Sequence, residues 1–493
     1  MSGKQLLAMT PLCITAGAAI LILIFIAVKR SFAFVTAFSL TASASAFISL
    51  FWVGRFAPLS VGSLLVIDRY ALFYMGLMIG ASFFIFLFAH GFFKSFPEHR
   101  EEFFLLTFLA VLGAAVLASS INFVSLFLGL EILSVSLYAL ISYAAPRKAG
   151  LESGIKYLIL GSAAAAFLLF GIALIYFETG TLDFAKSGAA LAAGVADTPV
   201  FFLGLSLLTV GLGFKLAVVP FHMWAPDVYQ GAPSPVTALI SSISKGGTFA
   251  LLLRLFLALE IHRYPSVLLG FTVISAASMF AGNLLALLQS NVKRLLAYSS
   301  ISHFGYLLVA LLAGGEVGAE AAAFYLLAYF VSIIAAFGVV TMLSVWDEEA
   351  ETLSDYRGLF WRRPWIAAVF TAALLSLSGI PMTAGFLGKF YVAAAGVRSS
   401  LWFLVVFLII NSALGLFYYL RIIVIMYQPG GPAERDRRAF PGGLPMGGVA
   451  LTVLILLLFW FGIFPSEIIG IIRRAVGVLE YASISAALVG GPR

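Results

Sequence analysis

Charged residues are scarce in this chain of 493 residues. Only 10% of its residues are Asp, Glu, Lys or Arg, whereas soluble domains carry roughly a quarter. Hydrophobic residues make up 62%, and the mean hydropathy is +1.08. This balance excludes a soluble multi-domain protein and indicates an integral membrane protein.

Cysteine and the common ligand-binding motifs are also nearly absent. The single Cys13 excludes an internal disulfide framework and a cysteine-ligated cluster. The five histidines lack metal-ligand spacing, and no GxGxxG or GxxxxGK[ST] pattern occurs. We therefore expect no cofactor and no metal in this chain. The net charge of +7 reflects membrane topology rather than a nucleic-acid partner.

Long apolar segments are abundant, and each membrane span needs about 20 such residues. The first, "ITAGAAILILIFIAV", ends at Lys29 and Arg30 without a small-residue cleavage site, so it is a span and not a removable signal. The segments predict an all-α integral membrane protein with about 14 transmembrane helices, centred near residues 18, 43, 80, 110, 132, 165, 211, 246, 277, 304, 332, 378, 414 and 456.

Basic residues in the connections predict the orientation of the chain. An even number of spans places both termini on one side, which holds nine Lys and Arg against sixteen on the other. Because cytoplasmic loops carry the excess of positive charge, we expect both termini to face outward. In a bacterium this means periplasmic termini and a multi-pass protein of the cell inner membrane.

A few charges fall inside the spans, where they are costly and usually functional. Of 22 acidic residues only Glu131 lies deep in a span. The basic residues inside spans are Lys215, Lys245, Arg254 and Lys389.

Two of these spans are interrupted as well. Span seven, which carries Lys215, breaks at Pro220, and span twelve reads "LSLSGIPMTAGFLGKFYV", with Gly379 and Pro381 in its middle. Paired broken helices at corresponding places mark the working centres of many transporters built from inverted repeats. We therefore expect two broken helices, spans seven and twelve.

The buried charges suggest a proton path, although each has a structural alternative. Glu131 and Lys215 keep one another charged if they face each other, or they form a static ion pair. Lys245 has no acid in its own span and sits too deep for snorkelling to an interface. Lys389 follows the break in its span, where free carbonyls can receive its ammonium group, and a structural anchor is the alternative.

Four further residues have weaker signals. His303, in "AYSSISHFGYLL", is a relay or a satisfied buried histidine. His222 orients its neighbours or carries protons, and Lys156 is a proton carrier or a snorkelling residue at the inner end of span six. Arg254 is read as an interface or inter-subunit anchor. The acidic run "WDEEAETLSD" at 346–355 is expected to be a solvated inner loop.

Three segments carry a family resemblance. "KLAVVPFHMWAPDVYQGAPSPVTALISSISK", "KRLLAYSSISHFGY" and "GIPMTAGFLGKFYV" resemble the antiporter-like membrane subunits of respiratory complex I and of multi-subunit cation/proton antiporters. Within that family, the segment "GFLGKFY" resembles the N-type subunit of NADH-quinone oxidoreductase, which has a lysine at this position of the twelfth span. The M-type subunit typically has glutamate there, and the L-type subunit continues into a long lateral helix for which about 25 residues are too few.

The resemblance implies roles for particular residues. Glu131 and Lys215 match the family's charge pair, Lys245 its central relay lysine and Lys389 its terminal proton-exchanging lysine. His303 matches a residue of the polar axis. The implied organisation is an N-terminal three-helix region, a first repeat of spans four to eight, a second of spans nine to thirteen, and the last span with its tail, at residues 1–95, 102–258, 266–427 and 445–493.

The resemblance also implies partners and a function. The chain is expected to translocate protons as NADH reduces quinone, beside other membrane subunits in the lipid bilayer, with the redox centres in other subunits. One alternative is a subunit of a cation (Na⁺)/proton antiporter without redox chemistry. A purely structural subunit is another, weakened by four titratable residues kept at membrane depth.

Overall fold

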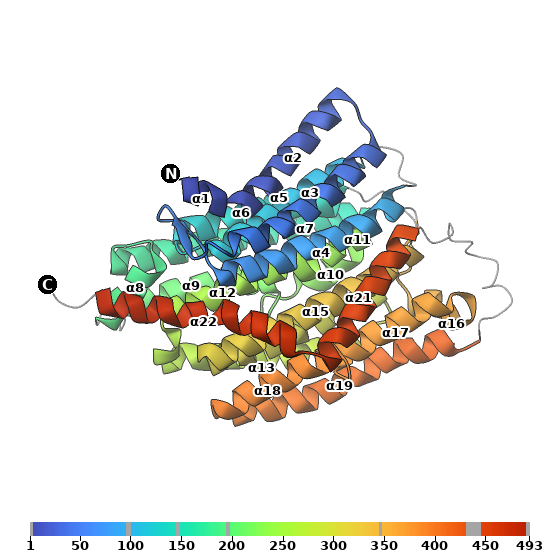
Figure 1. The fold of residues 1–493 in the computed structure, drawn as a ribbon. Coiled ribbons are helices and arrows are strands. Elements are labelled where there is room, and N and C mark those ends of the chain that lie inside the picture. The colour runs from blue at the N-terminus through green and yellow to red at the C-terminus, as the bar shows by residue number, and fades with distance from the viewer. Residues whose placement is uncertain are drawn as a thin grey trace.

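Helices make up nearly all of the structure, a computed structural model that describes residues 3–94, 100–143, 148–193, 198–344, 348–429 and 445–489 (Figure 1). The strands within these ranges form one antiparallel hairpin, β1 (Leu59–Val61) with β2 (Leu65–Ile67). The predicted all-α class is confirmed. The helices of the first half are α1 (Gly3–Ala8), α2 (Thr10–Val28), α3 (Phe32–Val53), α4 (Arg69–Phe93), α5 (Glu102–Ser119), α6 (Phe123–Tyr143), α7 (Lys148–Thr179), α8 (Phe184–Ala192), α9 (Pro199–Leu216), α10 (Trp224–Gly231), α11 (Ser234–Leu239) and α12 (Lys245–Ala258).

The second half begins with α13 and contains two long, deeply buried helices. Both α14 and α15 are almost wholly surrounded by protein. The helices are α13 (Pro265–Leu287), α14 (Val292–Ala313), α15 (Gly315–Leu343), α16 (Leu359–Arg362), α17 (Pro364–Ser378), α18 (Ala384–Arg398), α19 (Trp402–Tyr427), α21 (Pro445–Ile463) and α22 (Ser466–Val489).

The number of spans agrees with the sequence. In the described ranges, 13 helices are long and apolar enough to cross a membrane, one of them running from Ser234 to Ala258. The remaining span is divided between α17 and α18, each too short to cross alone. Thirteen plus this divided span gives the fourteen expected.

Both predicted breaks are present and have the same local geometry. Helix α9 ends at Ala217 and α17 ends at Gly379, and these two residues have left-handed backbones with φ of 57° and 85°. In each case the next amide reaches back five residues, Val218 N to Gly213 O at 3.1 Å and Ile380 N to Leu375 O at 3.0 Å. These hydrogen bonds close a helix end of the Schellman type, so each helix ends without leaving all its last carbonyls unpaired.

The two halves also pack in corresponding ways. Helix α5 packs against α6 as α13 does against α14, and α7 packs against α9 as α15 does against α17 and α18. The broken helix is therefore fourth in each set of five spans. This correspondence agrees with the predicted repeats, whose boundaries at 102–258 and 266–427 stay predictions.

The N- and C-terminal helices cover the outside of this pair. Helix α4 contacts α15, α21 and α22, and α22 leaves the end of α21 at an angle to run past α15 and α12 (Figure 1). The chain after the last span therefore folds back on its own subunit.

Candidate proton pathway

Lys215 is the first buried lysine and lies in the last turn of α9, two residues before the break. Its side chain is 2% exposed, and Nζ donates a hydrogen bond to the Tyr157 hydroxyl of α7 at 3.2 Å. The rings of Tyr157 and Tyr138 lie 5.0 and 5.5 Å from Nζ, close enough for cation–π attraction. Aromatic faces and one hydroxyl therefore solvate this ammonium group.

Glu131 lies in α6 but does not touch Lys215. No ion pair within 4.0 Å joins the two residues, although the carboxylate is near enough to attract the ammonium group electrostatically. Its Oε1 atom is buried and has no hydrogen-bond partner within the described part of the chain. The static ion pair considered as an alternative is thus not formed here.

Lys245 lies at the centre of the protein and is fully buried. It follows a one-turn π-helix, Ile240–Ser244, of the kind often found at functional positions. Nζ donates to Ser300 Oγ of α14 at 2.7 Å, and the same oxygen accepts a hydrogen bond from the Tyr329 hydroxyl of α15 at 2.7 Å. With no carboxylate in contact among the described residues, this lysine depends on the Ser300 hydroxyl.

His303 connects the centre to the second half. Its Nδ1 lies 2.6 Å from the Tyr325 hydroxyl and its Nε2 lies 3.1 Å from the Tyr419 hydroxyl. Its ring packs against Tyr329 at 5.3 Å and against Tyr306 at 5.7 Å between ring centroids. Tyr329 leads through Ser300 to Lys245, and Tyr306 lies beside Lys389. Because both ring nitrogens have hydroxyl partners, His303 can pass a proton from one side of its ring to the other.

Lys389 lies in α18, and its side chain reaches back to the end of α17 on the other side of the break. Nζ donates to the Ser378 carbonyl at 2.9 Å and to Ser412 Oγ at 2.8 Å. The Ser378 carbonyl is among those left free where α17 ends, as expected from the sequence. The Tyr306 ring lies 5.3 Å from Nζ and packs edge-on to His303.

These groups form a row through the buried helices. From Lys245 the row continues through Ser300 and Tyr329, then His303, and then Tyr306 to Lys389. On the side of Lys215, the Tyr229 ring lies 5.7 Å from the Lys245 Nζ. Tyr229 belongs to α10, which packs against α7, the helix that carries Tyr157. The Tyr229 hydroxyl is buried and unpaired within the described residues. Aromatic contacts rather than hydrogen bonds join Tyr329 to His303, His303 to Tyr306, and Tyr306 to Lys389.

His222 and Lys156 do not join this row. His222, just after Pro220, is 8% exposed, and its Nδ1 has no partner among the described residues. Lys156 has a half-exposed side chain and pairs with Glu152 at 2.7 Å and with Asp227 at 3.2 Å. Ion pairing, rather than snorkelling alone, therefore accounts for its position.

Asp227 forms ion pairs with two basic side chains, Lys156 and Arg294. It lies in α10, between α9 and the span that begins with α11. Besides Lys156, it accepts a hydrogen bond from Arg294 Nη1 at 2.7 Å. Partial burial raises the pKa of the Asp227 carboxyl, but the hydrogen bonds from Arg294 and Lys156 outweigh this effect, and the net pKa is lowered. The cluster joins α7, α10 and α14 at one membrane face.

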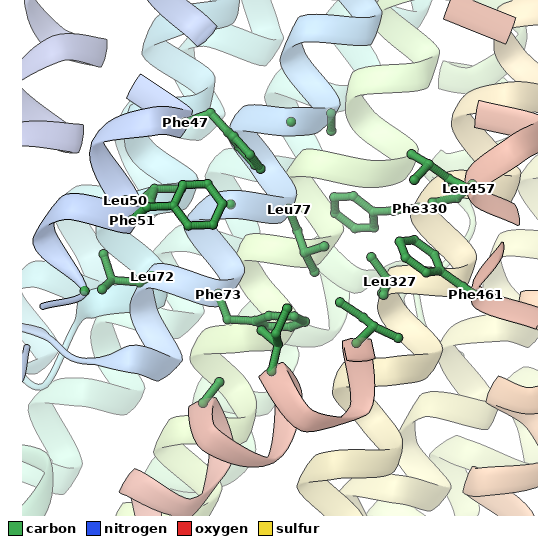
Figure 2. A pocket seen from close by; sticks show the side chains of 18 of the residues that line it. Phe47, Leu50, Phe51, Leu72, Phe73, Leu77, Leu327, Phe330, Leu457 and Phe461 are labelled. Atoms are coloured by element: carbon green, nitrogen blue, oxygen red, sulfur yellow. The ribbon is translucent and has the colours of Figure 1, made fainter. Parts of the chain in front are cut away.

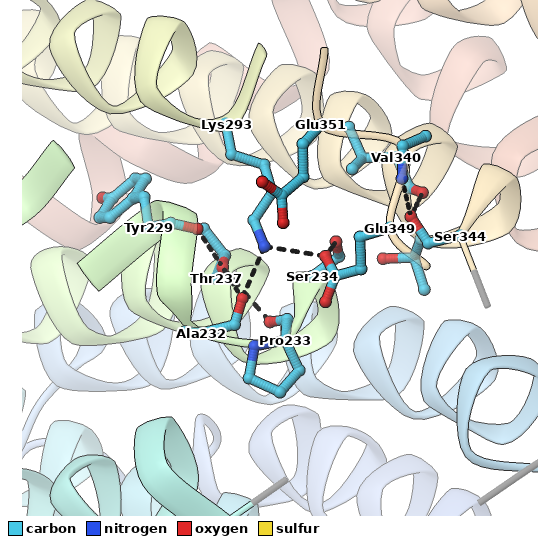
Figure 3. A network of polar contacts seen from close by, with 12 residues as sticks. Tyr229, Ala232, Pro233, Ser234, Thr237, Lys293, Val340, Ser344, Glu349 and Glu351 are labelled. Atoms are coloured by element: carbon cyan, nitrogen blue, oxygen red, sulfur yellow. Dashed lines mark hydrogen bonds and ion pairs between the residues drawn. The ribbon is translucent and has the colours of Figure 1, made fainter. Parts of the chain in front are cut away.

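The prediction that the loop at 346–355 is solvated is wrong for Glu349. Its side chain is 10% exposed and pairs with the fully buried Lys293 at 2.8 Å, and it also accepts a short hydrogen bond from Ser234 (Figure 3). Lys293 donates in addition to the Ala232 carbonyl at 2.7 Å. The loop therefore reaches inward because a buried lysine at the start of α14 needs a counter-charge; Trp346 and Asp347 lie outside the described residues.

Arg254 was expected at an interface, and the structure instead pairs it within the chain. It is 5% exposed and forms two hydrogen bonds to Asp68, at 2.8 and 2.9 Å, with a third to the Ala118 carbonyl. Asp68 also caps α4 by accepting from the Ala71 amide. Asp68 is thus a buried acid, 3% exposed, that was overlooked because it stands at a helix start.

The tyrosines of the row were missed as well. Tyr325 and Tyr329 lie four residues apart in α15 and so share one helix face, which is a signal that the sequence contains. Tyr419 of α19 also contacts Ser299 through a short hydrogen bond. Tyrosine is common in membrane helices, and only tertiary contacts distinguish these three from the others.

Comparison with known proteins identifies the family. The family model described as "NADH:quinone oxidoreductase/Mrp antiporter, TM" matches residues 120–415, more than half of the chain. The chain belongs to this family. The match includes every lysine of the row and Glu131, and it omits the helices α1 to α5 and α21 to α22.

Individual relatives agree over nearly the full length. The chain is 44% identical over 486 residues to NADH-quinone oxidoreductase subunit N of Ectopseudomonas mendocina, covering 96% of this chain and 97% of the relative. Among solved structures, respiratory complex I from Thermus thermophilus contains a chain with a TM-score of 0.80 and 33% identity, covering 93% and 98% of the two chains.

Two further structures share the fold at lower identity. A chain of an archaeal membrane-bound sulfane sulfur reductase has a TM-score of 0.88 at 24% identity and covers 98% of this chain and 99% of its own length. A chain of the Mrp complex from Dietzia sp. has a TM-score of 0.85 at 19% identity, and both chains are covered completely. These two likenesses concern the fold alone.

Proposed function

We propose that this chain translocates protons as the N-type membrane subunit of an NADH-quinone oxidoreductase. The full-length likeness to a subunit of that name supports the identity of the complex. The observation that carries the mechanism is the row from Lys245 to Lys389, in which each amine has a hydroxyl or carbonyl partner and a tyrosine-flanked histidine lies between.

Each residue of the row has a distinct part in the proposal. Lys215 receives a proton and is tuned by Glu131, whose charge acts across space rather than through contact. Lys245 passes it through Ser300 and Tyr329 to His303, and Lys389 releases it. A bridging water at the Tyr229 hydroxyl would complete the step between Lys215 and Lys245.

The remaining parts of the proposal concern the surroundings. The chain would lie in the cell inner membrane with both termini in the periplasm, as the excess of basic residues on the opposite side suggests. Other membrane subunits of the complex would flank it. Redox cofactors would be held by other subunits, and this chain would bind none.

Replacement of Lys245 tests the proposed relay. Lys245→Met keeps the length of the stem and removes the charge and the donor to Ser300, so coupled proton uptake in vesicles containing the reconstituted complex should fall at least tenfold. The matched control is Lys186→Met, because Lys186 is exposed and outside the row. Assembly of both variants is checked by the subunit content of the purified complex. Normal uptake by an assembled Lys245→Met complex would refute the relay.

A second function is favoured by the fold likeness to the Mrp complex. In that case the chain would exchange a cation such as Na⁺ for protons without redox chemistry. NADH-driven acidification that persists without Na⁺ supports the first function. Na⁺-dependent proton movement in vesicles, with no response to NADH, supports the second.

A further inference from the structure

A large apolar cavity lies between the terminal helices and α15, and none of the lysines of the row lines it. Its volume is about 840 Å³, within the range of pockets that hold small molecules. Figure 2 shows side chains from three sets of helices pointing into it: Phe47 and Phe73 from α3 and α4, Phe330 from α15, and Phe461 from α21. The wall is therefore built from segments far apart in the chain.

One side of the cavity is a groove along α4. Gly76 and Gly80 lie one turn apart on the face that lines the cavity. A Cβ atom at either glycine would meet only side-chain atoms at 3.5 Å or more, so packing within the protein does not require glycine there. The missing side chains leave a groove in which a long, thin apolar group can lie against the helix.

The charged side chains that line the cavity are positive. Arg55, Arg69 and Arg474 line the cavity, whereas no Asp or Glu of the described residues does. All three side chains are exposed, and none forms an ion pair with a described carboxylate. Arg474 donates only to the Gly470 carbonyl of its own helix. Three guanidinium groups without counter-charges therefore stand beside an apolar space.

The position of the arginines along the spans identifies the level of the membrane. Arg55 lies two residues after the end of α3, and Arg69 is the first residue of α4. Both stand where spans begin and end, which is the level of lipid headgroups. The apolar groove runs from there along α4, toward the middle of the bilayer.

We propose that this cavity binds one anionic phospholipid of the surrounding bilayer, with its phosphate at Arg55, Arg69 and Arg474 and its acyl chains between α4, α15 and α21. Arginine suits a phosphate because its planar fork donates two parallel hydrogen bonds. The apolar wall suits acyl chains, and the unpaired positive charge selects an anionic lipid over a neutral one.

This lipid would touch the helices that carry the row. Phe330 lines the cavity and packs so closely on Gly246 that a Cβ atom there would clash with its ring. Gly246 adjoins Lys245, and Tyr329 adjoins Phe330. Occupancy of the cavity therefore holds α15 against Lys245, an effect on transport that rests on the proposed function, whereas lipid binding itself does not.

The test compares lipid retained by the purified complex. In the variant Arg55→Gln/Arg69→Gln/Arg474→Gln, native mass spectrometry should show the loss of one bound phospholipid per complex. The matched control, Lys4→Gln/Lys186→Gln/Arg398→Gln, removes the same charge from exposed residues outside the cavity and should keep that lipid. Retention of all lipids by the arginine variant would overturn the proposal.

A second variant keeps the charges and fills the groove. Gly76→Leu/Gly80→Leu should lose the same lipid, even where the arginine variant does not assemble. After delipidation of the wild-type complex, phosphatidylglycerol should restore the bound lipid and phosphatidylcholine should not. Equal rescue by both lipids, or a cryo-EM map with a helix of a neighbouring subunit in the cavity, would contradict the proposal. All these readouts are independent of proton pumping.

Discussion

Lys389 distinguishes a proton-exchanging residue from a fixed positive charge. Its ammonium group is held by one carbonyl and one hydroxyl, with no carboxylate in contact among the described residues. Arginine retains a positive charge there but cannot release a proton at working pH. We expect Lys389→Arg to assemble and to lose most coupled proton uptake.

The comparison that decides the role of Lys389 is the arginine variant against Lys389→Ala. An anchor that needs only charge would work with Arg and fail with Ala, whereas a relay fails with both. Full uptake by an assembled Lys389→Arg complex would leave Lys389 as an anchor.

Glu131 tests whether electrostatic influence without contact matters. Since its carboxylate does not touch Lys215, Glu131→Gln changes charge and little else in the packing. We expect uptake and coupled quinone reductase turnover to fall severalfold, and Glu131→Asp to retain part of both. Wild-type rates in an assembled Glu131→Gln complex would show that Lys215 works without this charge.

Much of the row could be predicted at the scale of residues, and some of it could not. A lysine inside an apolar span is visible in sequence because burying it is costly. The gap between Glu131 and Lys215 depends on how α6 and α9 are spaced, which no local pattern contains. Glu349 was missed because an acidic loop resembles a solvated one until its buried partner is known.

At the scale of elements, the break after α17 positions the last lysine. A methyl group at Gly379 would lie 2.9 Å from Cδ and 3.3 Å from Nζ of Lys389, and the left-handed backbone there costs other residues about 1–2 kcal/mol. Gly379→Ala should therefore displace the ammonium group and reduce proton uptake severalfold in an assembled complex.

Gly270 of α13 provides the control for this change. A Cβ atom there meets nothing within 4 Å, and its φ is not positive, so Gly270→Ala should leave uptake unchanged. Equal activity of the two variants would mean that the geometry of the break does not position Lys389.

The breaks themselves were predictable, since proline and glycine interrupt apolar spans. The left-handed backbone that closes each helix end was harder to predict. Gly379 fits a left-handed helix end, but the corresponding residue in the first half is Ala217, and alanine gives no such signal. The π-helix before Lys245 has no sequence pattern that we can identify.

At the scale of the whole molecule, the Asp227 cluster joins three helices at one membrane face and should depend on pH. The Asp227 carboxyl has a lowered pKa in the folded state. Its contribution to stability is fully present above the unfolded pKa, near 4, and is lost as the pH falls through the lower folded pKa. Because the side chains are partly exposed, the contribution should be about 1 kcal/mol or less.

Thermal unfolding of the wild-type complex and Asp227→Asn from pH 3 to 7 measures this effect. The variant should be less stable at pH 7, and the difference should shrink toward pH 3. A difference that stays constant over this range would assign the effect to packing rather than charge.

The bond between Arg254 and Asp68 has a consequence for how such proteins diverge. A buried arginine left without its carboxylate typically destabilises a protein by about 3–5 kcal/mol, so neither residue can be replaced alone at little cost. Lineages should therefore change the two positions together or not at all. A homologue that lacks the segment with Asp68 should carry an uncharged residue where this chain has Arg254. An alignment of the family would show whether the two positions change together.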